Sequence, residues 1–173
     1  MTNYLQLPIG DGAPALVNAI IEIPAGGRNK YEYDKKLNIF RLDRNLHSPV
    51  HYPGDYGFIP QTLSSDGDPL DVLVLVDAPT FTGCLVEVRP IGLLEMVDSG
   101  QKDEKILSVA SNNPRFKEMK DFSEVWSHQL LEISHFFTTY KDLEGKRAIV
   151  SGWHNAESAR RVIQESHDRF LKK

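Results

Sequence analysis

The sequence has a single cysteine, Cys84, among its 173 residues, which excludes an internal disulfide framework and fits a reducing compartment. Its longest run of strictly apolar residues covers five positions (72–76), too few to span a bilayer. The N-terminal residues lack the basic flank and apolar stretch of a signal peptide, so we expect a cytoplasmic location. Basic residues (20) do not outnumber acidic ones (24), which argues against nucleic acid as a partner.

Two common phosphate-binding motifs are also absent. Lys146 follows a glycine but precedes Arg147, and the upstream glycine of a P-loop is missing. Gly10 and Gly12 lack the third glycine of a dinucleotide fingerprint. Neither kind of nucleotide-binding loop is therefore predicted.

What is present is typical of a globular protein, with 40% hydrophobic and 25% charged residues, and the length favours one domain over residues 1–173. The first two thirds of the chain predict short strands separated by turns. We expect strands at 16–23, at a hairpin of 29–34 and 38–43, at a central apolar segment 70–76, at 86–97 with a break at 90–92 and at 105–109, and a loop at 47–60.

The remainder of the chain is expected to be helical. Asn155 is a suitable N-cap for a last helix. Short strands followed by two helices predict an α+β fold, in which a small β-barrel carries two main helices on its outside. The first of these helices is indicated by apolar residues at helical spacing, namely Trp126, Leu130, Ile133, Phe137 and Tyr140.

The most informative segment is DGDPLD at residues 66–71, which holds the carboxylates of Asp66, Asp68 and Asp71. A solvated turn is one interpretation. Asp71, however, precedes the apolar run 72–76, where an ionised carboxylate is costly unless a cation or hydrogen bonds compensate. The intervening glycine and proline bend the chain, so the carboxylates can converge as oxygen ligands for Mg²⁺ or Mn²⁺. The spacing does not fit an EF-hand loop.

Other charged residues lie on strand faces or at strand ends. For each alone, a surface ion pair is the plainer interpretation, but together with the acidic segment they favour a shared site. They are Glu22, Lys30, Glu32, Arg44, Asp98, Asp103 and Lys105.

Short segments along nearly the whole chain carry a family resemblance. They are IEIP (21–24), KYEYD (30–34), DR (43–44), YPGDYGFIP (52–60), DGDPLDV (66–72), the set Asp98, Asp103 and Lys105, and YKDLE (140–144). In these the chain resembles the soluble, Mg²⁺-dependent inorganic pyrophosphatases of family I. The resemblance implies a five-stranded OB-like barrel, hydrolysis of pyrophosphate to two phosphates and, for a short bacterial-type chain, a homohexamer. Ser99 and Thr139 depart from the polar residues expected in bacterial relatives, which concerns subunit contacts and metal affinity rather than the reaction.

The resemblance also implies roles for the matching residues. Asp68 would be the general base that takes a proton from a water held between two ions. The implied metal ligands are Asp66, Asp71 and Asp103 for the tighter Mg²⁺, Asp98 and Asp103 for an ion delivered with substrate, and Glu22 and Glu32 through metal-bound water. The implied catalytic and phosphate-binding residues are Lys30, Arg44, Tyr56, Lys105, Tyr140 and Lys141, with Tyr52 in support.

These residue types suit a site that binds and hydrolyses a small polyanion. Seven carboxylates against four cationic groups leave the proposed site about three charges negative, and pyrophosphate brings about four more. About three or four Mg²⁺ ions would restore neutrality, so we expect activity to require metal, with Mn²⁺ as a possible substitute. Arg44 can hold a phosphate bidentately, whereas lysines act as point charges. For Tyr140, a role in core packing and a role in the site are both open.

The histidines and the cysteine predict no site of their own. His47 and His51 have a proline between them, which breaks a helical zinc face, so we expect loop or surface positions. His128 and His135 share a face of the expected helix and suit solvent or a subunit contact. Cys84 is expected to be a small buried residue.

Two other functions stay open. A binding module for oligonucleotides or sugars is common among small barrels, but it would need a basic and aromatic face where this sequence is acidic. A hydrolase of nucleotides or organic phosphates would need an apolar slot that the sequence does not show.

Overall fold

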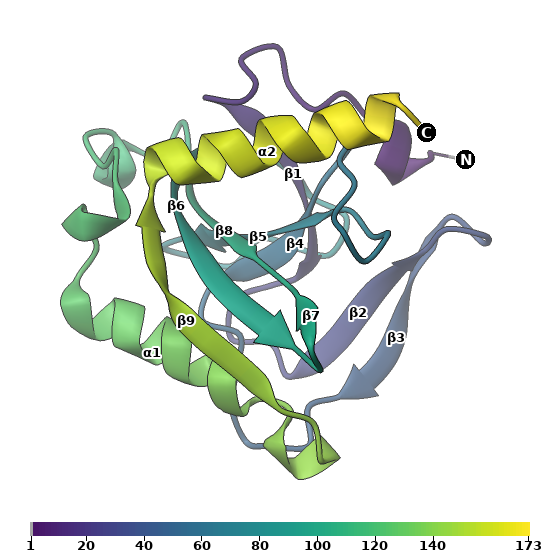
Figure 1. Ribbon diagram of the computed structural model, residues 1–173, viewed down its shortest axis with the longest axis vertical. Coiled ribbons are helices and arrows are strands. Elements are labelled where there is room, and N and C mark those ends of the chain that lie inside the picture. The colour runs from purple at the N-terminus through teal and green to yellow at the C-terminus, as the bar shows by residue number, and fades with distance from the viewer. Residues whose placement is uncertain (1) are drawn as a thin grey trace.

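Five strands close into a ring in the computed structural model, which describes residues 2–173 (Figure 1). Their order is β1–β4–β5–β8–β6 and back to β1. β5 and β8 are parallel, and the other neighbours in the ring are antiparallel. The expected five-stranded barrel of an α+β fold is confirmed. The ring consists of β1 (Val17–Ile23), β4 (Asp55–Ile59), β5 (Leu70–Leu75), β6 (Leu85–Asp98) and β8 (Lys105–Ala110).

The remaining elements extend or cover this ring. β2 (Asn29–Asp34) and β3 (Ile39–Asn45) form a separate two-stranded sheet, the expected hairpin, which stands beside the barrel in Figure 1. β7 (Gln101–Lys102) and β9 (Ala148–Asn155) both pair with β6. The helices are α1 (Ser127–Thr139) and α2 (Ala156–Leu171), with short 3₁₀ helices η1 (Tyr4–Gln6), η2 (Pro114–Phe116), η3 (Phe122–Glu124) and η4 (Asp142–Glu144).

Central strand β5 is apolar on both faces, as its sequence predicts, because each face is covered. Val72 belongs to a buried cluster that includes Ile163 of α2. Its neighbour Leu73 points the other way, into a cluster with Phe137 of α1. The two helices therefore cover opposite faces of the sheet and hold the strands that carry the site.

Helix α2 begins as predicted. The side-chain Oδ1 of Asn155 accepts a hydrogen bond from the backbone N–H of Ser158 at 3.0 Å, which is an N-cap. The helix then crosses the barrel (Figure 1), and its own residues Ala159 and Ile163 are fully buried against the strands. No helix within residues 2–173 has the length and apolar character needed to cross a membrane.

The prediction of a loop over residues 47–60 is wrong for the second half of this range, which forms strand β4. Every residue of β4 is buried. Gly57 has a packing reason here: a Cβ atom at this position would lie 1.8 Å from the carbonyl oxygen of Ile20 on β1. This glycine, which suggested a loop, thus allows β4 to approach β1 closely.

Four other expectations need correction. The final third is not entirely helical, because β9 lies between the helices; it is half-exposed and contains Gly152, so its apolar pattern is weak. The break at 90–92 is only a register shift between Pro90 and Gly92 inside the continuous strand β6. Trp126 is 80% exposed and lies outside the buried stripe of α1, and Cys84 is half-buried rather than buried.

Candidate active site

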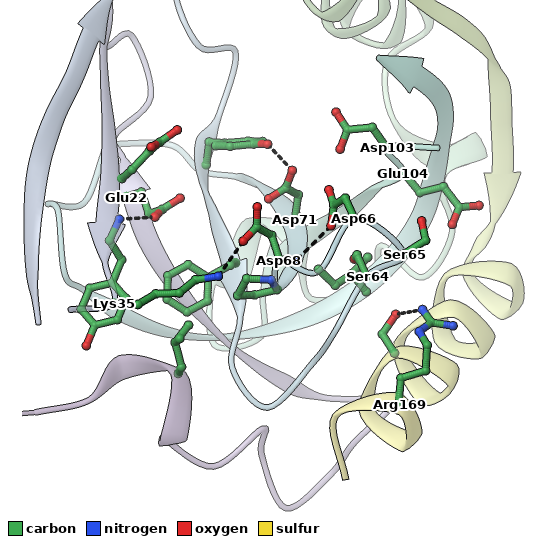
Figure 2. A pocket seen from close by; sticks show the side chains of 18 of the residues that line it. Glu22, Lys35, Ser64, Ser65, Asp66, Asp68, Asp71, Asp103, Glu104 and Arg169 are labelled. Atoms are coloured by element: carbon green, nitrogen blue, oxygen red, sulfur yellow. Dashed lines mark hydrogen bonds and ion pairs between the residues drawn. The ribbon is translucent and has the colours of Figure 1, made fainter. Parts of the chain in front are cut away.

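A cavity of about 620 Å³ brings together residues from distant parts of the sequence. Figure 2 shows the labelled carboxylates of Glu22, Asp66, Asp68 and Asp71 around one opening. They come from β1, β5 and the loop between β4 and β5. Eight of the site residues predicted from sequence line this cavity, namely Glu22, Lys30, Glu32, Tyr56, Asp66, Asp68, Asp71 and Asp103.

Asp71 is the centre of a hydrogen-bonded group. The hydroxyl of Tyr56 donates to Oδ2 of Asp71 at 2.6 Å, and Lys105 donates to the same oxygen. Lys105 also donates to Oδ1 of Asp103 at 2.5 Å. Strand pairing explains the arrangement, since Asp71 of β5 lies directly beside Lys105 of β8 in the parallel register. An ammonium group is thus fixed between two carboxylates.

The electrostatics of this group favour a cation. Burial opposes the charge of Lys105, whose side chain is 3% exposed, but the carboxylates of Asp71 and Asp103 outweigh it and raise the pKa of the amine. Burial also raises the pKa of Asp103, and the charge of Asp71 adds to this effect. The group formed by Asp71, Asp103 and Lys105 therefore sets two carboxylates against a single amine.

A second charged pair lies at the end of β6. Lys141 donates to Oδ2 of Asp98, and the hydroxyl of Ser99 donates to Oδ1 at 2.9 Å. Burial works against the charge of Asp98, but the bonds from Lys141 and Ser99 dominate and lower its pKa. The Lys141 Nζ atom also lies 5.1 Å from the centroid of the Tyr140 ring.

The β2–β3 hairpin contributes two further cations. Lys30 donates to Glu32 and lies 3.8 Å from Oδ2 of Asp43. Arg44, its partner in the strand register, donates to Asp43 at 2.5 Å and to Glu144 at 2.9 Å. Both cations are therefore held in defined positions before any ligand binds.

Glu22 has an unusual environment for a carboxyl group. Its Oε1 accepts the backbone N–H of Tyr33 at 2.8 Å. Burial nevertheless raises the pKa of Glu22 to about 8, and the nearby charge of Asp71 contributes in the same direction. In the metal-free protein Glu22 is consequently protonated over most of the neutral range.

Tyr52 and Tyr140 are packed among aromatic rings. The Tyr52 ring centroid lies 5.2 Å from that of Tyr56, and the Tyr140 centroid lies 5.2 Å from that of Phe136. Burial raises the pKa of both phenols, which therefore stay neutral. Core packing of Tyr140 is thus seen directly.

The acidic loop, residues 60–69, presents Asp66 and Asp68 at its exposed tip. Oδ1 of Asp66 accepts the backbone N–H of Asp68 at 3.0 Å, and Gly67 between them has φ +91°, which favours glycine. The Nζ atom of Lys35 reaches Asp68 from the hairpin turn (Figure 2).

Comparison with known proteins identifies the family of this arrangement. The inorganic pyrophosphatase family profile matches residues 19–171. The chain belongs to the inorganic pyrophosphatase family. The resemblance to family I and the expected enzyme class, a hydrolase, are therefore confirmed.

Individual pyrophosphatases match over almost their full length. The chain is 49% identical over 157 residues to the inorganic pyrophosphatase of Halalkalibacterium halodurans, covering 91% of this chain and 96% of the relative. It is 52% identical over 151 residues to that of Methanosarcina mazei, covering 87% and 89%. The crystal structure of the Thermus thermophilus inorganic pyrophosphatase superposes with a TM-score of 0.96 at 44% identity, covering 98% and 99%.

Some of the residues expected from the pyrophosphatase resemblance do not line this cavity. Lys105 reaches the cavity through Asp71 and Asp103, whereas Lys141 bonds to Asp98. The predicted site residues absent from the cavity lining are Arg44, Tyr52, Asp98, Lys105, Tyr140 and Lys141.

The sequence analysis missed several polar residues of the site. Asp43 and Glu144 hold Arg44, and both occur in segments that carry the family resemblance, which was the available signal. Lys35 and Arg169 also line the cavity, but neither belongs to a segment that carries the resemblance, so this signal did not mark them.

The donor set fits a hard divalent cation such as Mg²⁺ or Mn²⁺. The cavity lining contains carboxylate oxygens and neither histidine nor cysteine among the described residues. Within residues 2–173, no three acidic, histidine or cysteine side chains stand close enough together to hold one ion as they are placed. Asp66, Asp71 and Asp103 as a ligand set therefore stay a prediction.

Proposed function

We propose that this chain hydrolyses inorganic pyrophosphate to two orthophosphates in the carboxylate-lined cavity. The observation that carries this proposal is the meeting of eight expected site residues in one cavity of a pyrophosphatase-family fold. A small, fully charged substrate suits the carboxylates, amines and phenol that the cavity wall supplies.

Divalent cations, with Mg²⁺ as the proposed cofactor, suit the carboxylates of this cavity. When bound, they supply positive charge that neutralises the substrate and lowers the pKa of the attacking water. The residues proposed to hold them are Asp66, Asp71 and Asp103, with Asp98 and Asp103 for an ion that arrives with substrate, and Glu22 and Glu32 acting through water.

Asp68 is the proposed general base. Its carboxylate is exposed at the cavity mouth, where it can accept a proton from water and release it to solvent. Its present partner is Lys35, which is itself half-exposed, so the pair can separate without burying an unpaired charge.

The cations and phenols are proposed to bind the phosphate groups. Arg44 is held by Asp43 and Glu144, and its planar guanidinium suits bidentate contact with a phosphate group, whereas Lys30 and Lys105 act as point charges. Tyr56 donates a neutral hydrogen bond that adds no charge to the site. The other proposed phosphate-binding residues are Tyr140 and Lys141, with Tyr52 supporting the aromatic wall.

A phosphate-release assay tests the function. The protein is supplied with pyrophosphate, ATP or a sugar phosphate, each with Mg²⁺ and with EDTA. Release from pyrophosphate alone, abolished by EDTA, is the expected result. Equal turnover of ATP would favour the organic-phosphate hydrolase, and oligonucleotide binding without phosphate release would favour the binding module.

A homo-oligomer, with a hexamer favoured, is proposed for the assembly. Helix α1 exposes His128 and His135, and Trp126 and Leu131 beside them are exposed apolar side chains, which suits a subunit contact. Light scattering of the purified protein measures the assembly directly, and a monomer would overturn this part of the proposal.

A further inference from the structure

The tip of the acidic loop has little support of its own. Asp66 and Asp68 are exposed, and the bonds that shape the tip are local, such as the N–H of Ser64 donating to the carbonyl oxygen of Asp68 at 2.7 Å. A loop of this kind keeps its shape only if its base is fixed. The base is where the structure places its buried polar contacts.

Thr62 closes the neck of the loop. Its hydroxyl donates to the carbonyl oxygen of Ile59 at 2.5 Å and accepts the N–H of Leu70 at 2.9 Å. These two residues are the last of β4 and the first of β5. Thr62 is 3% exposed, so a single buried hydroxyl joins the two strand ends from which the loop emerges.

The last turns of α2 hold the same loop from its other side. The N–H of Leu63 donates to the carbonyl oxygen of Ser166 at 2.9 Å, and Nε of Arg169 donates to the carbonyl oxygen of Leu63 at 2.8 Å. Arg169 also donates to the hydroxyl of the fully buried Ser166 at 2.8 Å (Figure 2). The ring Nδ1 of His167 lies 2.7 Å from the carbonyl oxygen of Gln61.

We propose that Thr62 and Arg169 are positioning residues that hold the acidic loop in its metal-binding shape. Neither belongs to the residues proposed above to hold an ion or a phosphate group; their hydrogen bonds fix the backbone from which Asp66 and Asp68 project. The inference rests on the proposed function to the extent that these carboxylates serve a divalent cation. It adds the C-terminal helix, far away in sequence, to the parts of the chain that determine metal affinity.

The expected effect on metal affinity comes from the free-energy cost of ordering the acidic loop. A loosened loop must lose conformational freedom when a cation binds, and this cost subtracts from affinity. Changes to groups that orient metal ligands typically weaken metal binding by about tenfold or more. We therefore expect losses of about tenfold in Mg²⁺ affinity, with a smaller effect on kcat at saturating Mg²⁺.

The test compares Thr62→Val, which keeps the side-chain shape but removes the hydroxyl, with Thr62→Ser, which keeps the hydroxyl. Arg169→Met removes the guanidinium bonds at an exposed position, so it tests the same idea in a variant whose core is intact. Ser108→Ala is the matched control, because it also removes a buried hydroxyl, one that donates to the carbonyl oxygen of Leu73 at 3.3 Å.

Two readouts need no turnover: calorimetric titration of the metal-free proteins with Mg²⁺, and amide hydrogen exchange at Leu70 and in the acidic loop. We expect weaker Mg²⁺ binding and faster exchange in Thr62→Val and Arg169→Met, with Thr62→Ser and Ser108→Ala close to the unmodified protein. Unchanged Mg²⁺ affinity in both Thr62→Val and Arg169→Met, or an equal loss in Ser108→Ala, would overturn the inference. If the unmodified protein binds Mg²⁺ but releases no phosphate from pyrophosphate, the proposed function fails while these binding results still decide the inference.

Discussion

The Nζ atom of Lys35 lies 2.6 Å from Oδ1 of Asp68, so the turn of the β2–β3 hairpin reaches the acidic loop across the cavity. The two side chains are 48% and 67% exposed, which limits the contribution of this ion pair to at most about 1 kcal/mol. The pair is a contact between two exposed polar groups and contributes little to stability.

The first prediction follows from this pair. Lys35→Met leaves the proposed base in place, so kcat should stay within about threefold of the unmodified value, whereas Asp68→Asn should lower kcat by about 10²- to 10⁴-fold. Mg²⁺ binding should persist in Asp68→Asn. Steady-state kinetics and calorimetry measure both quantities, and full activity of Asp68→Asn would remove this residue as the base.

The second prediction concerns pH. A carboxyl group whose pKa is higher in the folded than in the unfolded state favours folding at low pH, and this contribution is lost as the group ionises. For Glu22 the loss extends from its ordinary value of 4.5 to about 8. Metal-free protein should therefore unfold at lower urea concentration at pH 8 than at pH 5, and Glu22→Gln should reduce this difference. An equal pH dependence in both proteins would contradict the assignment.

A third prediction concerns a buried carboxylate that has no role in the proposed reaction. Asp55 is fully buried and accepts three hydrogen bonds, from the N–H of Ala25 at 2.7 Å, the N–H of Thr80 at 3.0 Å and the Thr80 hydroxyl at 2.6 Å. Asp55→Ala leaves these donors without their acceptor and should cost about 3 kcal/mol or more in the free energy of unfolding. Urea denaturation measures this loss. Asp11→Ala, at an exposed position, should cost almost nothing, and equal stability of the two variants would argue against the role of Asp55.

The fourth prediction addresses phosphate handling. Lys141 bonds to Asp98 and is largely buried, whereas Lys146 is exposed nearby in the chain. Lys141→Ala should raise KM for pyrophosphate by about tenfold, because a charge-assisted contact is lost, and Lys146→Ala should not. Identical kinetics in the two variants would take Lys141 out of the phosphate-binding set.

Much of the fold follows from the sequence where local pattern and burial agree. β5 is apolar at consecutive positions and proves to be buried on both faces, and Asn155 caps α2 because its side chain satisfies a free N–H. β4 and β9 were not predicted. In β4, Gly57 is needed because the backbone of Ile20 lies so close, and composition does not reveal such a tertiary contact.

Eight of the predicted site residues line the cavity, but the geometry that brings them together could not be predicted from the sequence. The carboxylates of the DGDPLD segment stand out because charges precede an apolar strand. Lys105 lies beside Asp71 only because β5 and β8 are parallel neighbours, and sequence spacing cannot supply that register. The support of the loop by Arg169 depends on α2 folding back over the barrel, which again is a long-range contact.

The central claim is that the clustered carboxylates serve divalent cations, and calorimetric titration of metal-free protein with Mg²⁺ tests it most directly. We expect the unmodified chain to bind Mg²⁺ and Asp71→Ala to bind it at least about tenfold more weakly, since this carboxylate lies at the centre of the site. Pyrophosphate hydrolysis should fall in parallel. Equal Mg²⁺ affinity in the two proteins, or no binding by the unmodified chain, would contradict the account.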